Sequence, residues 1–293
     1  GVDSLGAVEL RNQLQRTVGD SISLSDTLMF DHPTARQVAL HIQGNQPTMA
    51  GGAVPAGGGV AADVEVAGLS LALPIGVASL TGLRESSHCG RDLLTEIPIS
   101  RWDVEQAAAE LIGSPPEVAS RVRHGGFMQD TELFEHGFFS ISAAEAAAMD
   151  PQQRQLLERG YSALHAAGMS KGSLLGAIVA VSVGQWASEF GSVLSASPAG
   201  RSVYAATGFS CSVTCGRVSF ALGLQGACAS YDTACSASLV GHHWNMRGLQ
   251  RLECTAALSA GVNMIFDSAR MRSNAVAGFT SVKGRSHTFD ARA

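Results

Sequence analysis

The residues with the clearest chemical potential lie in the stretch 223–239, where Cys235 stands between two apolar segments. The segment Ala227–Tyr231 is bounded by Gly and Asp, which predicts a buried strand, and the run from Leu239 is long enough for a helix. Cys235 is therefore expected at a strand-to-helix turn, where unpaired N–H groups and the helix dipole favour an anion. A thiol held there loses its proton more easily and becomes a nucleophile, and the N–H groups of the turn can help to hold a thioester oxyanion. The competing interpretation is a cysteine that is simply buried and does no chemistry.

The residues Asp232–Leu239, which read DTACSASL, resemble the active-site segment of the β-ketoacyl synthases, the condensing domains of polyketide and fatty acid synthases. The resemblance implies that Cys235 accepts the growing acyl chain as a thioester. In that family a Ser is more usual where this chain has Ala237. Similarity to the same family extends over residues 101–103, 125–127, 138–142, 146–154, 204–208, 216–220 and 283–291.

Departures from the family pattern lie upstream of Cys235. Phe209 stands where the family usually has Asn, and Cys211 stands where Pro is common. We expect these two changes to alter the pocket lining or the helix geometry. The segment Val64–Leu69 predicts a first strand and resembles the opening strand and glycine of the family, but residues 70–73 replace the usual continuation.

Alternating strands and helices are expected from Val64 onward. Asp150 followed by Pro151 predicts the start of a helix, because each residue suits its position there. The β-branched run 176–183 predicts a strand covered on both faces, and residues 256–263 predict another buried strand. With the resemblance, this order implies an α/β fold, the thiolase-like layered αβαβα fold, of which we expect the N-terminal half.

The first 43 residues predict a small helical unit. A helix capped by Asp3 or Ser4 is expected to end near Gly19, and a last helix is expected after residue 34. A resemblance to the second half of an acyl carrier protein runs over residues 1–5, 9–12 and 27–34. It implies that Ser4 carries a covalent 4′-phosphopantetheine arm, whereas the plainer interpretation of Ser4 is a helix N-cap. We therefore expect a partial all-α acyl carrier bundle without the family's first helix.

Residues 44–63 contain Gly, Pro, Ala and Val without periodicity, which predicts a flexible linker. The expected division is a partial phosphopantetheine-binding domain at 1–43, a linker at 44–63 and the N-terminal part of a β-ketoacyl synthase domain at 64–293. A tethered carrier raises the effective concentration of its cargo at the next site.

Composition narrows the classes of protein to consider. The 293 residues are 45% hydrophobic and 15% charged, with a net charge of −5, which indicates a core-forming protein and argues against a nucleic-acid partner. Six cysteines without CxxC pairs predict no metal site and favour a reducing, cytoplasmic setting. No apolar run reaches the roughly 18 residues of a membrane span. The chain opens on Gly-Val-Asp-Ser-Leu without an initiator Met, so we expect a piece of a longer polypeptide.

No histidine in the sequence is an obvious base for Cys235. His242 and His243 follow on the expected helix, but the helical rise places them about 10 to 12 Å away, so packing or subunit-contact roles are expected. In the family, two His residues of downstream motifs stabilise the charge that develops during malonyl decarboxylation. Those motifs have no counterpart here, and His287 matches no catalytic position. The chain is expected to carry the thioester-forming nucleophile without the decarboxylation machinery.

The leading hypothesis is a part of a modular polyketide or fatty acid synthase. An acyl chain carried at Ser4 would pass to Cys235 for decarboxylative Claisen condensation with a malonyl-type thioester, which is acyltransferase chemistry of the β-ketoacyl synthase type. The implied partners are acyl and malonyl-type thioesters, a phosphopantetheinyl transferase, other synthase domains and a second copy in a homodimer. Two alternatives stay open. One is a truncated or degenerate synthase that acts as a carrier or assembly partner without catalysis, and the other is a thiolase-fold acyltransferase that condenses without decarboxylation.

Overall fold

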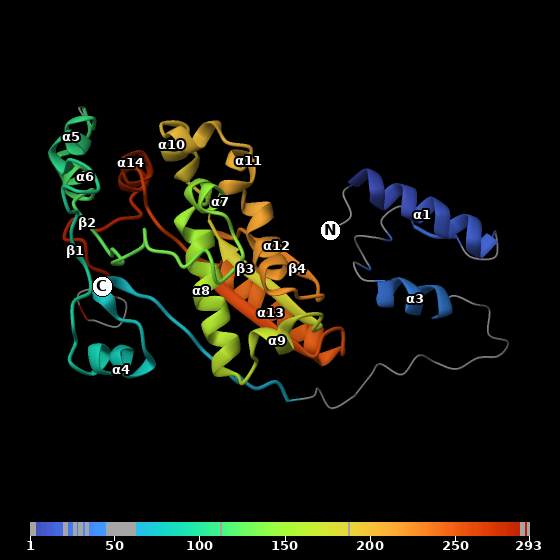
Figure 1. The fold of residues 1–293 in the computed structure, drawn as a ribbon. Helices are drawn as coiled ribbons and strands as arrows, with labels where there is room; N and C mark the ends of the chain where they lie inside the picture. Colours follow the sequence, from blue (N-terminus) through green and yellow to red (C-terminus); the bar gives the residue numbers. More distant parts are fainter. Residues whose placement is uncertain are drawn as a thin grey trace.

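The computed structural model describes residues 4–19, 23–25, 28, 32, 35–44, 63–111, 113–186, 188–287 and 291. Among these residues, no helix is both long enough and apolar enough to cross a bilayer. The elements follow in chain order (Figure 1) as α1 (Ser4–Val18), α3 (Ala35–Gly44), η2 (Pro74–Gly76), α4 (Leu80–His88), β1 (Thr95–Glu96), α5 (Val104–Ala109), α6 (Pro116–Ser120), β2 (His124–Gly125), α7 (Ala143–Ala148), α8 (Pro151–Ala166), α9 (Lys171–Leu174), β3 (Val179–Gln185), α10 (Phe190–Ser195), η3 (Pro198–Arg201), α11 (Ala205–Gly208), α12 (Cys211–Leu222), β4 (Cys228–Tyr231), η4 (Ala234–Ser236), α13 (Ala237–Gln250), β5 (Ala256–Val262) and α14 (Ser268–Val276).

A three-stranded parallel sheet in the order β4-β3-β5 lies between helices (Figure 1). All seven residues of the central strand β3 are buried, because α8 and α12 cover one face of the sheet and α13 covers the other. The predicted strands at 176–183, 227–231 and 256–263 are confirmed, with boundaries that shift by a few residues. The layer order helix–sheet–helix is the one expected for half of a layered α/β fold.

Alternation along β3 sends successive side chains to opposite faces of the sheet. Val181 faces α8 and α12 and belongs to the main apolar core. The next residue, Ser182, faces α13, where its Oγ donates to the Gly241 carbonyl at 2.8 Å. Asn245 of α13 also reaches the sheet, because its Nδ2 donates to the Leu258 carbonyl at 2.9 Å. These buried hydrogen bonds fix α13 on the sheet.

The helix α8 begins at a fully buried capping residue, as the sequence predicts. Asp150 is 0% exposed and accepts a hydrogen bond from the Gln152 N–H at 2.7 Å, and Pro151 occupies the first helical position. The same carboxylate accepts from Gln152 Nε2 at 3.1 Å and from the Ser188 hydroxyl. Burial raises the pKa of Asp150, and these hydrogen bonds oppose the rise only in part. Asp150 therefore joins the start of α8 to the segment that follows β3.

Replacing Asp150 with alanine is expected to lower the free energy of unfolding by about 2 to 4 kcal/mol. The loss of an N-cap accounts for about 1 kcal/mol, and buried donors left without an acceptor account for about 1 to 3 kcal/mol. Urea denaturation followed by circular dichroism measures the change. Asp103→Ala is the matched control, because Asp103 caps α5 at an exposed site and should lose only about 1 kcal/mol. Equal losses of stability in the two variants would contradict the role given to the buried hydrogen bonds of Asp150.

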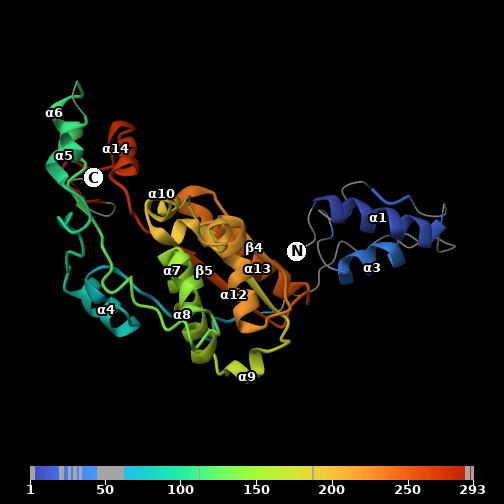
Figure 2. The same ribbon diagram turned by 45° about the horizontal axis from the view of Figure 1, so that its top comes forward.

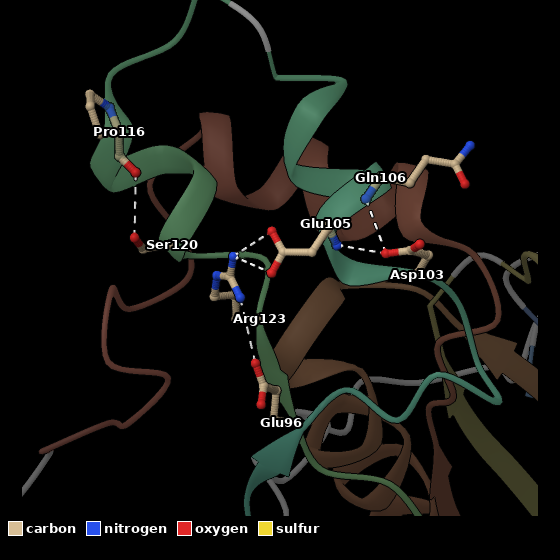
Figure 3. Close-up of polar contacts among 7 residues, drawn as sticks. All are labelled: Glu96, Asp103, Glu105, Gln106, Pro116, Ser120 and Arg123. Carbon is tan, nitrogen blue, oxygen red and sulfur yellow. Dashed lines mark hydrogen bonds and ion pairs between the residues drawn. The ribbon is translucent and has the colours of Figure 1, made fainter.

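A second cluster forms around β1, β2, α5, α6 and α14. The antiparallel strands β1 and β2 pair Thr95 with Gly125. Figure 3 shows Arg123 between Glu105 of α5, whose carboxylate oxygens lie 2.8 and 2.9 Å from Nη2, and Glu96 of β1, which lies 3.6 Å from Nη1. Exposed pairs of this kind contribute less than about 1 kcal/mol each. The stronger support comes from the buried side chains of Ile97, Val104, Val122, Met271 and Ala275.

The helices α1 and α3 lie beside each other in both views (Figures 1 and 2), which confirms the two helices predicted for the first unit. Arg11 Nε donates to the Leu24 carbonyl at 3.1 Å, and the Leu24 N–H donates to Gln15 Oε1 at 2.8 Å. Most of the predicted turn at 27–31 and of the predicted linker at 44–63 lies outside the described residues. The small apolar core of this unit consists of Leu24, Leu28 and Val38, with Leu14, Val18 and Ile42 packed against it.

The predicted first strand at Val64–Leu69 is wrong. Residues 63–72 pair with no strand among the described residues, and Val66 is 75% exposed. Instead Gly68 lies against the end of α8, where a Cβ atom would come within 2.2 Å of the Ala163 carbonyl oxygen. Close contact between backbone and helix, rather than a ladder of hydrogen bonds, therefore holds this extended segment.

Candidate active site

Cys235 lies where the chain passes from the sheet to a helix. The strand β4 ends at Tyr231, the short 3-10 helix η4 covers Ala234–Ser236, and α13 begins at Ala237. The predicted strand–turn–helix arrangement is confirmed, with Cys235 in η4 immediately before α13. Cys235 is exposed and forms no disulfide, so a reactant can reach this turn from solvent.

Backbone strain and local hydrogen bonds shape the turn. Ala234 has a φ of 54°, in the left-handed region, which costs a residue with a Cβ atom roughly 1 to 2 kcal/mol. The Ala234 N–H donates to Asp232 Oδ1 at 3.2 Å. Ser236 Oγ donates to the Thr233 carbonyl at 2.9 Å and lies 2.9 Å from Thr233 Oγ1. These hydrogen bonds offset the strain and fix the backbone on both sides of Cys235.

Two glycines let the start of α13 lie directly on the ends of the strands. A Cβ atom on Gly184 of β3 would come within 2.2 Å of the Ser238 backbone nitrogen and 2.6 Å of the Ala237 carbonyl carbon. A Cβ atom on Gly261 of β5 would come within 2.8 Å of Ser238 Cβ. Because the first contact is with backbone, no rotation of a side chain can relieve it. Gly184 therefore determines how closely the helix after Cys235 approaches the sheet.

The two histidines of α13 lie away from this turn, as predicted from their spacing. Both are exposed, and His242 Nδ1 lies 3.3 Å from Ser259 Oγ of β5. Seven residues of helix separate His242 from Cys235, about 10 Å along the axis. Neither histidine makes a described contact with the turn. Their assignment as packing or subunit-contact residues stays a prediction.

Sequence reasoning missed Gly184, Asp232 and the conformation of Ala234. Gly184 had a signal, because an isolated glycine within a β-branched strand often marks the close approach of another backbone. The role of Asp232 and the conformation of Ala234 had no signal in the sequence. The left-handed backbone of Ala234 depends on the hydrogen bond from its N–H to Asp232.

Ser4 is the first residue of α1, at the position where the helix begins. The structure places it in the unit of α1 and α3, and Cys235 in the unit around the sheet. Among the described residues, no group of three His, Cys, Asp or Glu side chains could hold a metal ion. A cavity of about 300 Å³ lies between residues 72–78, residues 128–133 and α8, and its lining includes no residue of the Cys235 turn.

Comparison with protein families finds two matches that divide the chain. Residues 61–293 match the model described as "Beta-ketoacyl synthase, N-terminal domain". Residues 1–42 match the model described as "Phosphopantetheine attachment site". The phosphopantetheine attachment predicted from sequence is thereby confirmed at the level of the domain.

Curated relatives are components of large polyketide synthases. The chain is 40% identical over 273 residues to the pikromycin polyketide synthase component PikAII of Streptomyces venezuelae, an alignment that covers 90% of this chain and 7% of the relative. It is 34% identical over 297 residues to the erythronolide synthase EryA2 of Saccharopolyspora erythraea, covering 100% of this chain and 8% of the relative. The chain therefore spans less than a tenth of the length of these relatives.

Solved structures of ketosynthases share the fold. The ketosynthase from module 6 of the bacillaene synthase of Bacillus subtilis 168 matches with a TM-score of 0.64 and 30% identity, over 73% of this chain and 34% of that one. The oxazolomycin ketosynthase domain OzmH KS7 of Streptomyces albus JA3453 matches with a TM-score of 0.67 and 28% identity, over 76% of this chain and 39% of that one. The thiolase-like fold predicted from sequence is thereby confirmed. The chain belongs to the modular polyketide synthases, with a phosphopantetheine attachment site ahead of the N-terminal part of a β-ketoacyl synthase domain.

Proposed function

We propose that Cys235 is the residue on which this chain accepts an acyl group as a thioester, and that Ser4 bears the arm from which the group comes. The observation that carries the proposal is the exposed thiol on a strained turn between a parallel strand and a helix. The proposal divides the chain into a carrier part at 1–43, a linker at 44–63 and a synthase part at 64–293. The two family matches, at 1–42 and 61–293, support this division.

The step at Cys235 is a thioester exchange. The sulfur attacks the carbonyl carbon of the incoming thioester, a new S–C bond forms, and the donor thiolate leaves after the tetrahedral intermediate collapses. The carbonyl oxygen carries negative charge in that intermediate. The N–H groups of Ser236 and Ala237 already donate to the carbonyls of Thr233 and Ala234, so the positive end of the α13 dipole is the feature suited to stabilise this charge. The acyl group at Cys235 is then in place for condensation with a malonyl-type thioester.

Ser4 suits a phosphodiester because it begins α1, a helix of 15 residues. The N-terminus of a helix attracts an anion through its free N–H groups and its dipole, and the serine hydroxyl is the group to which the phosphate is joined. When bound, 4′-phosphopantetheine supplies a terminal thiol that carries an acyl group as a thioester. A phosphopantetheinyl transferase is the partner that this modification requires.

The proposal also includes a homodimer through the synthase part and a cytoplasmic setting. Phe220 of α12 is 90% exposed and Val203 is 89% exposed, and large apolar side chains in such positions favour a covering partner. All six cysteines are free thiols, which suits a reducing compartment.

The function is tested by priming the chain with a phosphopantetheinyl transferase and an acyl-coenzyme A. Wild type should gain the mass of the acylated arm on the peptide that contains Ser4, and the acyl group should then pass to the peptide that contains Cys235. Ser4→Ala should gain no mass on the Ser4 peptide, because the hydroxyl that receives the phosphate is gone, and its Cys235 peptide should be acylated only at the slower rate of direct loading from acyl-coenzyme A. Ser23→Ala removes an exposed serine elsewhere in the carrier part and should behave as wild type. Peptide mass spectrometry follows both positions.

Two results would contradict the proposal, and they can be told apart. Priming that persists in Ser4→Ala would exclude Ser4 as the attachment residue. Priming of wild type without any transfer to Cys235 would exclude the acyl acceptor and favour a carrier or assembly role without catalysis.

A further inference from the structure

A hydrogen bond joins the carrier part to the synthase part. Gln37 of α3 donates from Nε2 to Glu253 Oε1, and the two atoms lie 2.6 Å apart. Glu253 belongs to the turn between α13 and β5, 216 positions later in the chain. Both side chains are partly buried. The pair marks a contact surface between the two parts of the chain.

The turn that carries Glu253 is fixed by its own backbone. Leu252 has a φ of 58°, in the left-handed region that a residue with a Cβ atom seldom adopts. The Leu252 N–H donates to the Leu249 carbonyl at 3.0 Å, and the Glu253 N–H donates to the Gly248 carbonyl at 2.9 Å. The next residue, Cys254, is buried. The Glu253 carboxylate is therefore held at a defined place on the surface, and backbone strain of this kind is often retained where a surface has a function.

On the carrier side, α3 keeps Gln37 outside the apolar core. Val38 and Ile42 pack in the small core of the carrier part. Successive residues of an α-helix point about 100° apart, so Gln37 lies beside this apolar stripe and not within it. The helix can therefore bind the synthase part without uncovering the carrier core.

The turn that binds α3 lies at the end of the sheet opposite Cys235. Cys235 follows the carboxyl end of β4, whereas Glu253 precedes β5, and the three strands are parallel. The Thr255 N–H donates to the Ile178 carbonyl at 3.0 Å, so the turn also lies beside the start of β3. The seven residues of β5 span about 23 Å. In both views α3 lies on the side of the synthase part away from α10, which follows the carboxyl end of β3 (Figures 1 and 2).

A contact of this size suits a carrier that is tethered to its partner. A single hydrogen bond to a carboxylate is too weak to hold two separate proteins together. Residues 44–63, proposed as a linker, connect α3 to the synthase part and keep the two surfaces at a millimolar effective concentration. Under these conditions a weak contact is occupied for part of the time and is released quickly, so the carrier is free to leave it for Cys235.

We propose that α3 of the carrier part docks reversibly on the turn between α13 and β5, with the Glu253 carboxylate accepting from Gln37, as a resting position away from Cys235. The occupant is the carrier of the same chain, because the hydrogen bond is made within the chain. The docking is independent of the role proposed for Cys235, and only its nature as a resting position rests on that role.

The docking is tested in the full chain by carbodiimide cross-linking, which joins an amine to a carboxylate when the two are in contact. Gln37→Lys places an amine at the docking position of α3. Trypsin should then yield peptide 37–84 joined to peptide 252–270, and fragmentation should place the link at Glu253. The other carboxylate of peptide 252–270, Asp267, should stay unlinked.

Two variants control the cross-link. Glu253→Gln added to Gln37→Lys should abolish the link, because the reacting carboxylate is gone. Thr17→Lys places the amine at an exposed position near the end of α1 that lies away from the synthase part in both views (Figures 1 and 2). It should link to peptide 252–270 about tenfold less, because only the tether brings it near. The docking is overturned if Thr17→Lys links to this peptide as well as Gln37→Lys does, or if the link survives Glu253→Gln.

Small-angle X-ray scattering tests the docking without an added amine. Glu253→Ala removes the acceptor, so its radius of gyration should exceed that of wild type as the carrier part moves away. Glu85→Ala removes an exposed carboxylate of α4 and should scatter as wild type does. Equal radii for wild type and Glu253→Ala would overturn the docking.

The resting position is tested with the cross-linked Gln37→Lys chain, primed with an acyl-coenzyme A and desalted. Transfer of its acyl group to Cys235 should be about tenfold slower than in carbodiimide-treated Thr17→Lys, because the carrier stays at the far end of the sheet. Loading of Cys235 from a soluble acyl thioester should be equal in the two samples. Equal transfer would overturn the resting position. Loss of both reactions in both samples would refute the acceptor role of Cys235, and with it the resting position, whereas the cross-link would still demonstrate the docking.

Discussion

Replacing Cys235 with alanine is expected to abolish acyl loading from a soluble acyl thioester, with a fall in rate of at least about 1000-fold. The reason is chemical, since the methyl side chain of alanine cannot form the S–C bond on which the exchange depends. The backbone of the turn should be unaffected, because its hydrogen bonds come from Asp232, Thr233 and Ser236. Intact-protein mass spectrometry against time measures the loading.

Cys228→Ala is the matched control for this variant. Both cysteines are exposed, both lie in tryptic peptide 218–247, and they are only seven positions apart. Acyl loading of Cys228→Ala should therefore equal that of wild type within a factor of about two. Loading of Cys235→Ala at the wild-type rate would mean that another residue is the acceptor.

The second large effect is expected for Gly184→Ala. The added methyl group would lie 2.2 Å from the Ser238 nitrogen and 2.5 Å from its Cα, so α13 must move away from β3. Overpacking of this kind destabilises proteins by about 1 to 3 kcal/mol and sometimes more, and we expect the upper end because backbone cannot rotate aside. A displacement of about 1 Å at a reacting group can lower a rate about 100-fold, so acyl loading at Cys235 should fall by that order.

Two other glycines provide a graded comparison. The methyl group of Gly261→Ala would lie 2.8 Å from Ser238 Cβ, a longer approach than the 2.2 Å at Gly184, so this variant should have a smaller effect on both stability and loading. Gly216→Ala has no atom within 4 Å of its new Cβ and lies inside α12, so it should be neutral or stabilising by up to about 1 kcal/mol. Urea denaturation and acyl-loading rates rank the three variants by stability and by activity. A Gly184→Ala variant as stable as Gly216→Ala would contradict the close contact between α13 and β3.

Much of the synthase part could be predicted from sequence because its signals are local. The β-branched run that became β3, the Asp150–Pro151 pair that begins α8 and the apolar segment that became β4 each specify an element without reference to distant residues. The position of Cys235 follows from the elements on either side of it. These features locate Cys235 on the fold.

The remaining features depend on residues that meet only after folding. The segment 64–69 has the composition of a strand, but an apolar pattern cannot indicate whether a neighbouring strand is present to pair with it. The clash at Gly184 requires knowledge of where α13 lies, more than fifty residues later in the chain.

The most direct measurement is the position of the acyl group on wild-type chain after brief exposure to an acyl thioester. Chymotrypsin cleaves after Tyr231 and so separates Cys228 from Cys235. We predict that the acyl group lies on the peptide that begins at Asp232 and that mild hydroxylamine removes it, as expected for a thioester. An acyl group found on the Cys228 peptide, or on no cysteine peptide at all, would contradict the assignment of Cys235 as the acceptor.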